Sequence, residues 1–178
     1  MITHPLVVLV TGAASGIGFA VSEHLAKEGH RVIISDLNLA AAEQAAAKLV
    51  AQGYKAQPWA LNVASQVDID QVAAQFPRVD VLINNAGLQH VAKLEDFPVE
   101  KWRFLNEVLL VGPAMLTRAC LPAMKANNFG RIINIGSIHA LIASPFKSAY
   151  VAAKHGLIGF SKTIALEAAE FNITINTI

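Results

Sequence analysis

The sequence predicts an α/β protein with a doubly wound parallel sheet and helices on both of its faces. Three observations favour this class. Short apolar runs alternate with longer stretches of helical periodicity, and such alternation is typical of parallel sheets. A glycine-rich turn links the first apolar run to a helical stretch. Gly12, Asn84 and Ser137 each follow an expected strand, at the edge where such sheets bind ligands.

The elements are expected in the following order along the chain. The strands are expected near 6–11, 31–35, 54–60, 79–83, 130–136 and 173–178. The helices are expected near 16–29, 39–52, 65–76, 99–126 and 146–171. A chain of 178 residues with 54% hydrophobic content suits a single domain over 1–178 with a substantial core.

The first strand leads into a glycine-rich turn, Thr11-Gly12-Ala13-Ala14-Ser15-Gly16-Ile17-Gly18. Gly12 allows a tight turn, while Gly16 and Gly18 let backbone N–H groups approach a pyrophosphate at the start of the following helix. The candidate cofactor-binding residues of this turn are Gly12, Ser15, Gly16, Ile17 and Gly18. Their spacing is G-x-x-x-G-x-G rather than G-x-G-x-x-G, so a glycine turn without a ligand stays open as the alternative.

The second strand, Arg31 to Ser35, ends at Asp36. A carboxylate at this place can accept hydrogen bonds from the ribose hydroxyls of an adenosine and would repel a 2′-phosphate. Because no Arg or Lys stands in the glycine turn or at Leu37 and Asn38, we expect NAD rather than NADP as the cofactor. The alternative is that Asp36 caps the next helix, and one carboxylate could serve both purposes.

The last expected helix carries Tyr150 and Lys154 four residues apart, and Ser137 lies thirteen residues before Tyr150. Residues i and i+4 share one face of a helix, so the ammonium can lie near the phenol. A free phenol has a pKa near ~10, and a neighbouring cation favours the phenolate that a base at neutral pH requires. Ser137 can exchange a hydrogen bond with the oxygen that gains or loses the proton. A chance pair on a solvated helix face is the alternative.

Asn84-Asn85-Ala86-Gly87 follows the fourth strand, so TGAASGIG, NNAG, Ser137 and YVAAK stand in this order. With these motifs the chain resembles the short-chain dehydrogenases/reductases over residues 6–178. The resemblance implies a three-layer Rossmann-type fold, catalytic Ser137, Tyr150 and Lys154, and a nicotinamide cofactor that Tyr150 and Lys154 also contact. It further implies that the residues on the adenosine side of the cofactor are Asn62, Val63, Asn85, Ala86 and Gly87.

The stretches GLQHVAKLEDFPVEKW and INIGSIHALIASPFKSAYVAAKHG are similar to those of D-3-hydroxybutyrate dehydrogenases. This closer resemblance implies an NAD-dependent interconversion of a 3-hydroxy acid and its 3-oxo acid, with Tyr150 as acid and base. The implied substrate-binding residues are Gln89, Ser137, His139, Lys147 and Tyr150. A loop histidine and a solvated lysine are the alternatives for His139 and Lys147. The functional alternatives are a 3-oxoacyl or sugar-alcohol oxidoreductase and a non-catalytic NAD-binding fragment.

One position departs from the family, whose members usually carry a catalytic Asn on the long helix after NNAG. The register from Trp102 places Leu109 there, and Asn106 lies three residues away, out of register. No proton relay is therefore assigned to Asn106. The relay is expected to use water and backbone groups alone, or the activity to be impaired.

Composition limits the classes of binding partner and the cellular compartment that we expect for this chain. A net charge of +1 gives no electrostatic case for nucleic acid or an anionic membrane. The apolar run Val108 to Leu116 is nine residues long, whereas a membrane-spanning helix needs about 20. The first apolar run has no Lys or Arg before it and is read as a strand rather than a signal peptide. The single cysteine, Cys120, allows no intrachain disulfide and fits a cytoplasmic protein, and no metal site is expected.

The last six residues, ITINTI, are read as the sixth strand, and the family's substrate lid and seventh strand do not follow. We therefore expect a chain that is truncated at its C-terminal end relative to the family, either a fragment or a truncated gene product. The resemblance implies a homo-oligomer that pairs through the helices near 99–126 and 146–171. Small residues of the second helix would permit close approach: Ala152, Ala153, Gly156 and Gly159.

Overall fold

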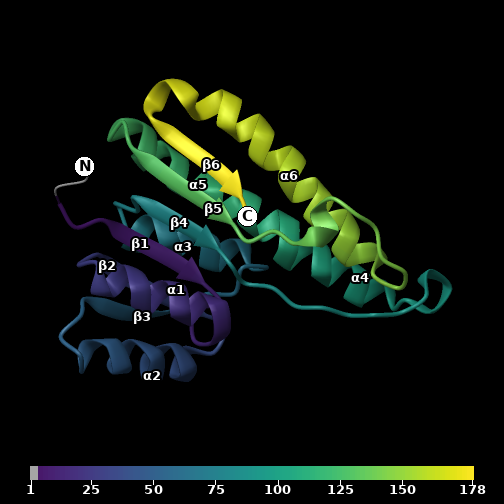
Figure 1. Cartoon of the computed structure of the whole chain (residues 1–178), viewed down its shortest axis with the longest axis horizontal. Helices are drawn as coiled ribbons and strands as arrows, with labels where there is room; N and C mark the ends of the chain where they lie inside the picture. Colours follow the sequence, from purple (N-terminus) through teal and green to yellow (C-terminus); the bar gives the residue numbers. More distant parts are fainter. Residues whose placement is uncertain (1–3) are drawn as a thin grey trace.

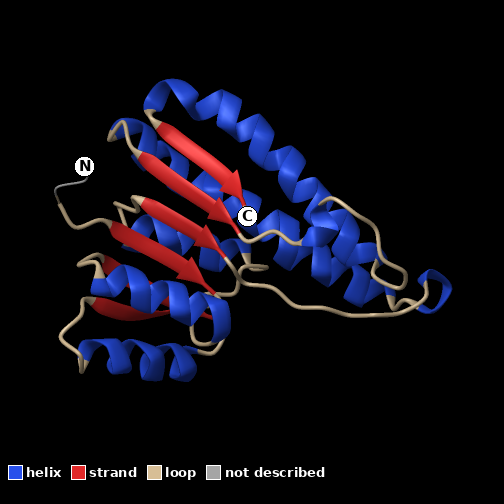
Figure 2. Ribbon diagram, viewed as in Figure 1, coloured by secondary structure: helices blue, strands red, loops and turns tan. Residues whose placement is uncertain are grey.

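A computed structural model describes residues 4–178 and shows one parallel sheet of six strands between two layers of helices (Figures 1 and 2). The strands are β1 (Val7–Thr11), β2 (Arg31–Asp36), β3 (Ala56–Ala60), β4 (Val81–Asn84), β5 (Gly130–Asn134) and β6 (Ile173–Thr177). The helices are α1 (Gly16–Lys27), α2 (Leu39–Val50), α3 (Gln66–Gln75), α4 (Val99–Asn106), α5 (Gly112–Ala126) and α6 (Ser148–Ala168). The predicted doubly wound α/β fold is confirmed.

The strand order is β3-β2-β1-β4-β5-β6, so the chain reverses direction across the sheet between β1 and β4. All neighbouring strands are parallel, with Leu9 of β1 opposite Ile33 of β2 and Leu82 of β4. The arrowheads in Figure 2 therefore all end at one edge of the sheet. Ligands of such sheets bind beyond this edge, where the strand order reverses.

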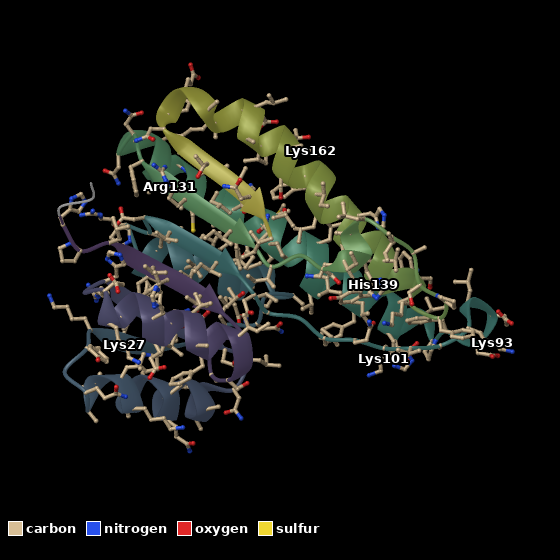
Figure 3. All side chains as sticks on the ribbon, viewed as in Figure 1. Lys27, Lys93, Lys101, Arg131, His139 and Lys162 are labelled. Carbon is tan, nitrogen blue, oxygen red and sulfur yellow. The ribbon has the colours of Figure 1, made fainter. Side chains whose placement is uncertain are left out.

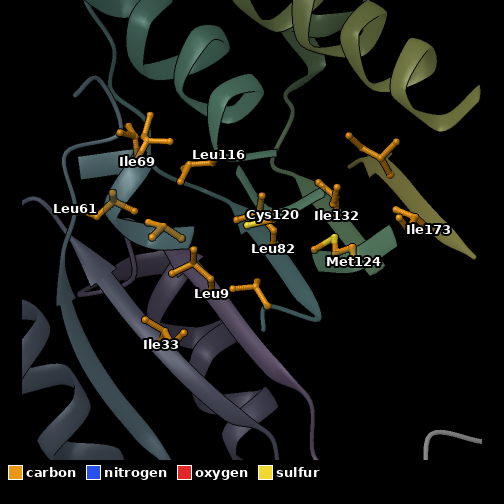
Figure 4. Close-up of a cluster of buried hydrophobic side chains, with 14 of the residues drawn as sticks. Leu9, Ile33, Leu61, Ile69, Leu82, Leu116, Cys120, Met124, Ile132 and Ile173 are labelled. Atoms are coloured by element: carbon orange, nitrogen blue, oxygen red, sulfur yellow. The ribbon is translucent and has the colours of Figure 1, made fainter. Parts of the chain in front are cut away.

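Each face of the sheet has its own hydrophobic core. Successive side chains of a strand point to opposite faces, so Leu9 and Ile33 pack with α3 and α5, while Val10 and Ile34 pack with α1 and α2. Figure 4 shows the first core, where the sheet meets three side chains of α5: Leu116, Cys120 and Met124. Because both of their faces are buried, β1, β2 and β4 are nearly continuous apolar runs, whereas the edge strand β6 alternates buried and exposed residues.

The helix predicted over 99–126 contains a widened turn. α4 ends at Asn106, a π-helical turn spans Glu107–Val111, and α5 begins at Gly112. The N–H of Gly112 bonds the carbonyl of Glu107, five residues earlier. Pro113 explains this geometry, because its ring has no N–H and would clash with the carbonyl four residues before it in a regular helix. A Cβ on Gly112 would also collide with the carbonyl oxygen of Val63.

By length and composition alone, the helical stretch Val99–Ala126 could cross a membrane, with a mean hydropathy of 1.3 in its most apolar part. Counting only the nine apolar residues from Val108 to Leu116 therefore underestimates the length of the apolar helical stretch. The core helix of a globular domain passes the same test. This stretch packs on the sheet through Leu116, Cys120 and Met124, so these apolar residues belong to the core.

Several expected boundaries move by one to three residues. β5 ends at Asn134, which leaves the next residues, through Ser137, as a loop at the sheet edge. The helix expected from 146 begins at Ser148. Phe146 has φ of +65°, in the left-handed region that a right-handed helix cannot contain. After α6 the chain makes a 3-10 turn, Ala169–Phe171, before β6.

Candidate functional site

The glycine turn connects β1 to α1 at the carboxyl edge of the sheet. Gly12 and Gly16 have φ of +60° and +56°, conformations that side chains disfavour. A Cβ on Gly12 would lie 2.9 Å from the Cα of Ala86, and a Cβ on Gly18 would collide with the carbonyl oxygen of Gly12. The close packing of this turn against the segment after β4 therefore already requires glycine at both positions.

The start of α1 can receive an anion. Ser15 is the N-cap, and within residues 4–178 its side chain makes no capping hydrogen bond. The first turn of α1 carries no acidic side chain. The N–H groups of a first helical turn have no partner within the helix, and with the helix dipole they form a binding site for phosphate groups.

Asn85 joins the two loops that flank the strand-order reversal. Its side-chain Nδ2 donates to the carbonyl oxygens of Thr11, at 2.9 Å, and Gly12, at 3.0 Å. In return, the Thr11 hydroxyl accepts from the backbone N–H groups of Asn85, at 3.0 Å, and Ala86, at 2.9 Å. Four hydrogen bonds thus fix the glycine turn to the NNAG segment.

A cleft of about 510 Å³ runs along this edge. Most of the predicted cofactor-binding residues line it: Gly12, Ser15, Ile17, Asp36, Asn62, Val63, Asn85, Ala86 and Gly87. Among the described residues that line the cleft there is no Arg or Lys. The glycine turn and this cleft therefore suit a dinucleotide, with the helix start at one side and a carboxylate at the other.

Asp36 supplies that carboxylate, and it also shapes the loops around it. Its Oδ2 accepts from the backbone N–H of Ala14 at 3.2 Å, and its Oδ1 accepts from that of Asn38 at 3.1 Å. The helix cap considered for Asp36 is wrong. Asn38 caps α2, with its side chain accepting from the N–H of Ala41 at 3.2 Å.

Asn62 and Val63 follow β3 on the same edge. The side-chain oxygen of Asn62 accepts from the N–H of Ala64 at 3.0 Å, and its backbone N–H donates to Asp68 at 2.9 Å. These bonds hold the turn, while one lone pair of the oxygen and the side-chain NH₂ stay available.

Lys154 lies on the inner face of α6 and, like Gly16, Gly18 and Tyr150, is not among the described residues that line the cleft. Its side chain is only 6% exposed, and its Nζ donates to the carbonyl oxygen of Ile135, just after β5. Nζ is 5.7 Å from the ring centre of Tyr150, one turn earlier on the helix. Burial lowers the pKa of Lys154 from 10.5 to about 8.

Ser137, His139, Lys147 and Tyr150 form one group. The Ser137 hydroxyl accepts from the backbone N–H of His139 at 3.1 Å. The His139 ring meets the Tyr150 ring edge-on, with centres 6.1 Å apart, and its Nε2 lies 3.2 Å from Nζ of Lys147. Figure 3 shows His139 beside the N-terminal half of α6.

The structure does not join Gln89 to this group. Its side chain is exposed and accepts from the backbone N–H of the next residue, His90, at 3.1 Å. No described contact links Gln89 with His139 or Lys147. The predicted amide donor is therefore turned onto its own loop.

An apolar cluster lies behind Tyr150. Leu109 sits in the π-helical turn, is 1% exposed, and packs with Ala149 and Ala153 of α6. Asn106 cannot substitute for a relay residue in this arrangement, because its Nδ2 bonds the carbonyl of Trp102 one turn back at 2.9 Å.

A model of the short chain dehydrogenase family matches residues 6–178. The chain belongs to this family. Among curated relatives, Uncharacterized oxidoreductase YxjF of Bacillus subtilis is 45% identical over 97% of this chain. D-beta-hydroxybutyrate dehydrogenase of Cupriavidus necator is 41% identical over 96% of this chain. These matches cover 68% and 67% of the relatives, so the chain spans about two thirds of their length.

Solved structures agree with this short-chain dehydrogenase fold. A short-chain dehydrogenase from Streptomyces avermitilis gives a TM-score of 0.90 at 35% identity, covering 99% of this chain and 65% of that one. A metagenomic short-chain oxidoreductase in complex with NADP gives 0.92 at 32% identity, covering 97% and 80%. Short-chain dehydrogenases are oxidoreductases that use a nicotinamide cofactor, but the family alone does not select NAD or NADP.

Two groups of this short-chain dehydrogenase site escaped the sequence analysis. The Thr11 hydroxyl is buried and holds the NNAG backbone, yet a threonine ending a strand carries no distinctive signal. The carbonyl of Ile135 holds Lys154, and a backbone group has no sequence signature at all.

Proposed function

We propose that this short-chain dehydrogenase interconverts a 3-hydroxy acid, with D-3-hydroxybutyrate as the expected substrate, and its 3-oxo acid, using NAD. The observation that carries the proposal is the contact between His139 and Lys147 next to Tyr150. Two relatives named D-beta-hydroxybutyrate dehydrogenase, 41% and 42% identical to this chain, support the same substrate class.

The His139–Lys147 pair suits a carboxylate, which an uncharged pocket would bind only at a large desolvation cost. The Lys147 ammonium has three N–H donors, and one of them is directed at Nε2 of His139. When Nε2 accepts this bond, the ring proton is on Nδ1, and Nδ1 is enclosed with no partner among the described residues. The Lys147 ammonium therefore retains two N–H donors for the substrate carboxylate, while His139 helps to position this ammonium.

The hydroxyl end of the substrate would be handled by Ser137 and Tyr150. Tyr150 accepts the proton of the substrate hydroxyl in oxidation and returns it in reduction. The Lys154 ammonium, 5.7 Å from the ring centre, stabilises the phenolate, and the carbonyl of Ile135 holds that ammonium in place. Ser137 hydrogen-bonds the reacting oxygen. Bound NAD would supply the hydride acceptor.

NAD is favoured over NADP by the chemistry of the adenosine side. Gly12, Ser15 and Ile17 would hold the pyrophosphate at the start of α1, and Asp36 the ribose. A 2′-phosphate would meet the Asp36 carboxylate in a cleft whose described lining has no cation.

Other relatives act on different alcohols by name. They include a 3-oxoacyl-[acyl-carrier-protein] reductase of Synechocystis, 37% identical, and a D-threitol dehydrogenase of Mycolicibacterium smegmatis, 36% identical. Neither named substrate type requires a site for a free carboxylate beside the reacting carbon. The His139–Lys147 pair therefore favours the hydroxy acid. A non-catalytic NAD-binding role is the second candidate, because Leu109 contributes an apolar side chain, not a proton relay, to the cluster that packs against Tyr150.

The test compares D-3-hydroxybutyrate with its methyl ester, which has the same hydroxyl but no charge. NADH formation is followed by absorbance for the wild type and Lys147→Ala. We expect Lys147→Ala to raise KM for the acid by about tenfold or more, the loss of about 1.4 kcal/mol of binding, and to leave the ester unchanged. Lys101→Ala, an exposed lysine on α4, is the control. Equal losses with both substrates would refute the carboxylate role, and NAD binding without any turnover would favour the non-catalytic candidate.

We also propose a cytoplasmic homo-oligomer. A groove of about 450 Å³ between α5 and α6 has an apolar lining that includes Met115, Leu121, Phe160 and Ile164, and a second copy would cover it. The cytoplasmic part of the proposal rests on the single cysteine. Burial raises the pKa of Cys120 to about 12, so its thiol stays protonated and unreactive. Light scattering that reports only monomer across working concentrations would refute the oligomer.

A further inference from the structure

A buried chain of polar side chains crosses the sheet next to the catalytic residues. Nδ2 of Asn84, at the end of β4, donates to Oδ1 of Asn134, at the end of β5, at 2.8 Å. Nδ2 of Asn134 donates to the hydroxyl of Ser161 on α6 at 2.9 Å. The Ser161 hydroxyl also lies 2.8 Å from that of Thr177, at the end of β6. Three strands and one helix are thus tied together; Figure 1 shows β4, β5 and β6 side by side, with α6 running along β6.

The part of this chain of hydrogen bonds from Asn84 to Ser161 is shielded from water, while Thr177 is only partly buried. Asn84, Asn134 and Ser161 are 4%, 0% and 5% exposed. Ser161 completes its own bonding by donating to the carbonyl of Leu157 at 2.7 Å. In such surroundings an unpaired amide is costly, so removing the Ser161 hydroxyl would leave the Asn134 side chain without its acceptor.

This chain of bonds is attached directly to the site. Asn134 immediately precedes Ile135, whose carbonyl holds Lys154, and stands three residues before Ser137. Ser161 is seven residues after Lys154, about two helical turns, so both side chains lie on the inner face of α6. α6 is therefore fastened to the end of β5 at two points: Lys154 to Ile135, and Ser161 to Asn134.

Two attachment points constrain a helix more than one does. With Lys154 as the single hydrogen bond to β5, the position of α6 along β5 would depend on apolar packing, which is less directional than a hydrogen bond. A second directional bond two turns away fixes that position, whereas an apolar contact at the same place would tolerate sliding. Ser137 moves with β5, and Tyr150 moves with α6, so the same bond fixes their relative position.

We propose that Ser161 is a positioning residue for the reaction, because its bond to Asn134 sets the register between α6, which carries Tyr150 and Lys154, and β5, which leads to Ser137. The effect on turnover rests on the proposed function. The register itself is independent of which substrate is used.

The test uses Ser161→Ala, Ser161→Thr and a matched control. Threonine keeps the hydroxyl, and its methyl group has room because Ser161 borders a groove of about 240 Å³ between α6 and β6. Thr163→Ala is the control, because the Thr163 hydroxyl also bonds the carbonyl four residues back, at 3.2 Å, but is exposed. Turnover is measured as NAD-dependent oxidation of D-3-hydroxybutyrate.

We expect Ser161→Ala to lower kcat on the order of tenfold with KM little changed, because misplacing catalytic groups costs rate rather than binding. Ser161→Thr and Thr163→Ala should stay within about twofold of the wild type on the same reasoning. Should Ser161→Ala not fold, Ser161→Cys replaces it. Its sulfur is a weak hydrogen-bond acceptor of similar shape, and it should lower kcat by less than alanine.

A second measurement does not depend on turnover. The Lys154 ammonium is titrated by NMR in protein with ¹³C-labelled lysine Cε, with its signal assigned by its loss in Lys154→Arg. Loosening α6 should admit water and raise the pKa of Lys154 from about 8 towards 10.5 in Ser161→Ala only. A wild-type titration and wild-type kcat in Ser161→Ala would overturn the proposal, as would an equal loss in Ser161→Thr. If the wild type never oxidises hydroxybutyrate, the proposed function fails, and the titration still decides the role of Ser161.

Discussion

Lys154 should make the folded protein less stable at neutral pH than a neutral side chain would. Burial lowers the pKa of Lys154 from 10.5 to about 8, which corresponds to about 3 kcal/mol of unfavourable free energy for the ammonium in the folded chain. Because the folded-state pKa lies below the unfolded one, the unfolded chain binds more protons between the two values. The free energy of unfolding therefore carries the full penalty below about pH 8 and recovers it as the pH rises to 10.5.

Lys154→Met isolates this effect, because methionine fills a similar volume without charge. The substitution also loses the hydrogen bond to the carbonyl of Ile135, at a net cost of about 1 kcal/mol. We therefore expect the variant to be more stable than the wild type by about 2 kcal/mol at pH 7 and to be inactive. At pH 10.5 the advantage should be gone, because the wild-type lysine is then almost entirely neutral in the folded chain and about half neutral in the unfolded one, so most of the penalty has been recovered.

Urea unfolding at pH 7 and pH 10.5 measures the difference in the free energy of unfolding between Lys154→Met and the wild type at each pH. Lys162→Met, on the same helix but exposed, is the control and should show no pH-dependent difference from the wild type. A Lys154→Met variant that is less stable at pH 7, or whose advantage is the same at both pH values, would refute the reasoning.

Three further outcomes follow from the site. Tyr150→Phe should lower kcat by about 10³ while NAD affinity in a fluorescence titration stays unchanged, because only the proton-transferring hydroxyl is lost; single turnover at the wild-type rate would contradict this. Asp36→Asn should narrow the preference for NAD over NADP by about tenfold or more, since one charge repulsion at ~4 Å and an effective dielectric of ~20 is worth about 4 kcal/mol before screening. Comparable dissociation constants of the wild type for the two cofactors would disprove the role of Asp36. Gly12→Ala should destabilise the fold by about 1–2 kcal/mol, because its φ is positive and its Cβ would press on Ala86; a thermal melt at the wild-type temperature would exclude that contact.

The parts of the site that sequence could predict are local ones. The glycine turn and the Tyr150–Lys154 pair lie within single segments, where strand or helix geometry fixes which side chains share an edge or a face. The strand ends follow from the apolar runs, so Asp36 was expected at the carboxyl edge and is found there.

The parts that sequence could not predict depend on contacts between segments. Lys147 meets His139 because the loop before α6 turns back at Phe146, and nothing in that loop marks a phenylalanine with positive φ. Gln89 carries an amide that could contact a substrate, but the oxygen of this amide accepts a hydrogen bond from the backbone N–H of His90. The cap of α2 fell to Asn38 rather than Asp36 by a shift of two residues, which is within the usual uncertainty of helix ends.

The hydrogen bond from the Ala14 N–H to Asp36 couples cofactor choice to loop shape. The residue that would discriminate between NAD and NADP also helps to hold the turn that would carry the pyrophosphate. Replacing Asp36 with alanine to admit NADP would therefore weaken the binding of both cofactors at once. Asparagine keeps an acceptor for Ala14, and a new cation at Leu37, which borders the same cleft, could then face the added phosphate. Changing the cofactor preference of this chain from NAD to NADP therefore requires two coordinated substitutions, at Asp36 and Leu37. A screen of single variants would not find this combination.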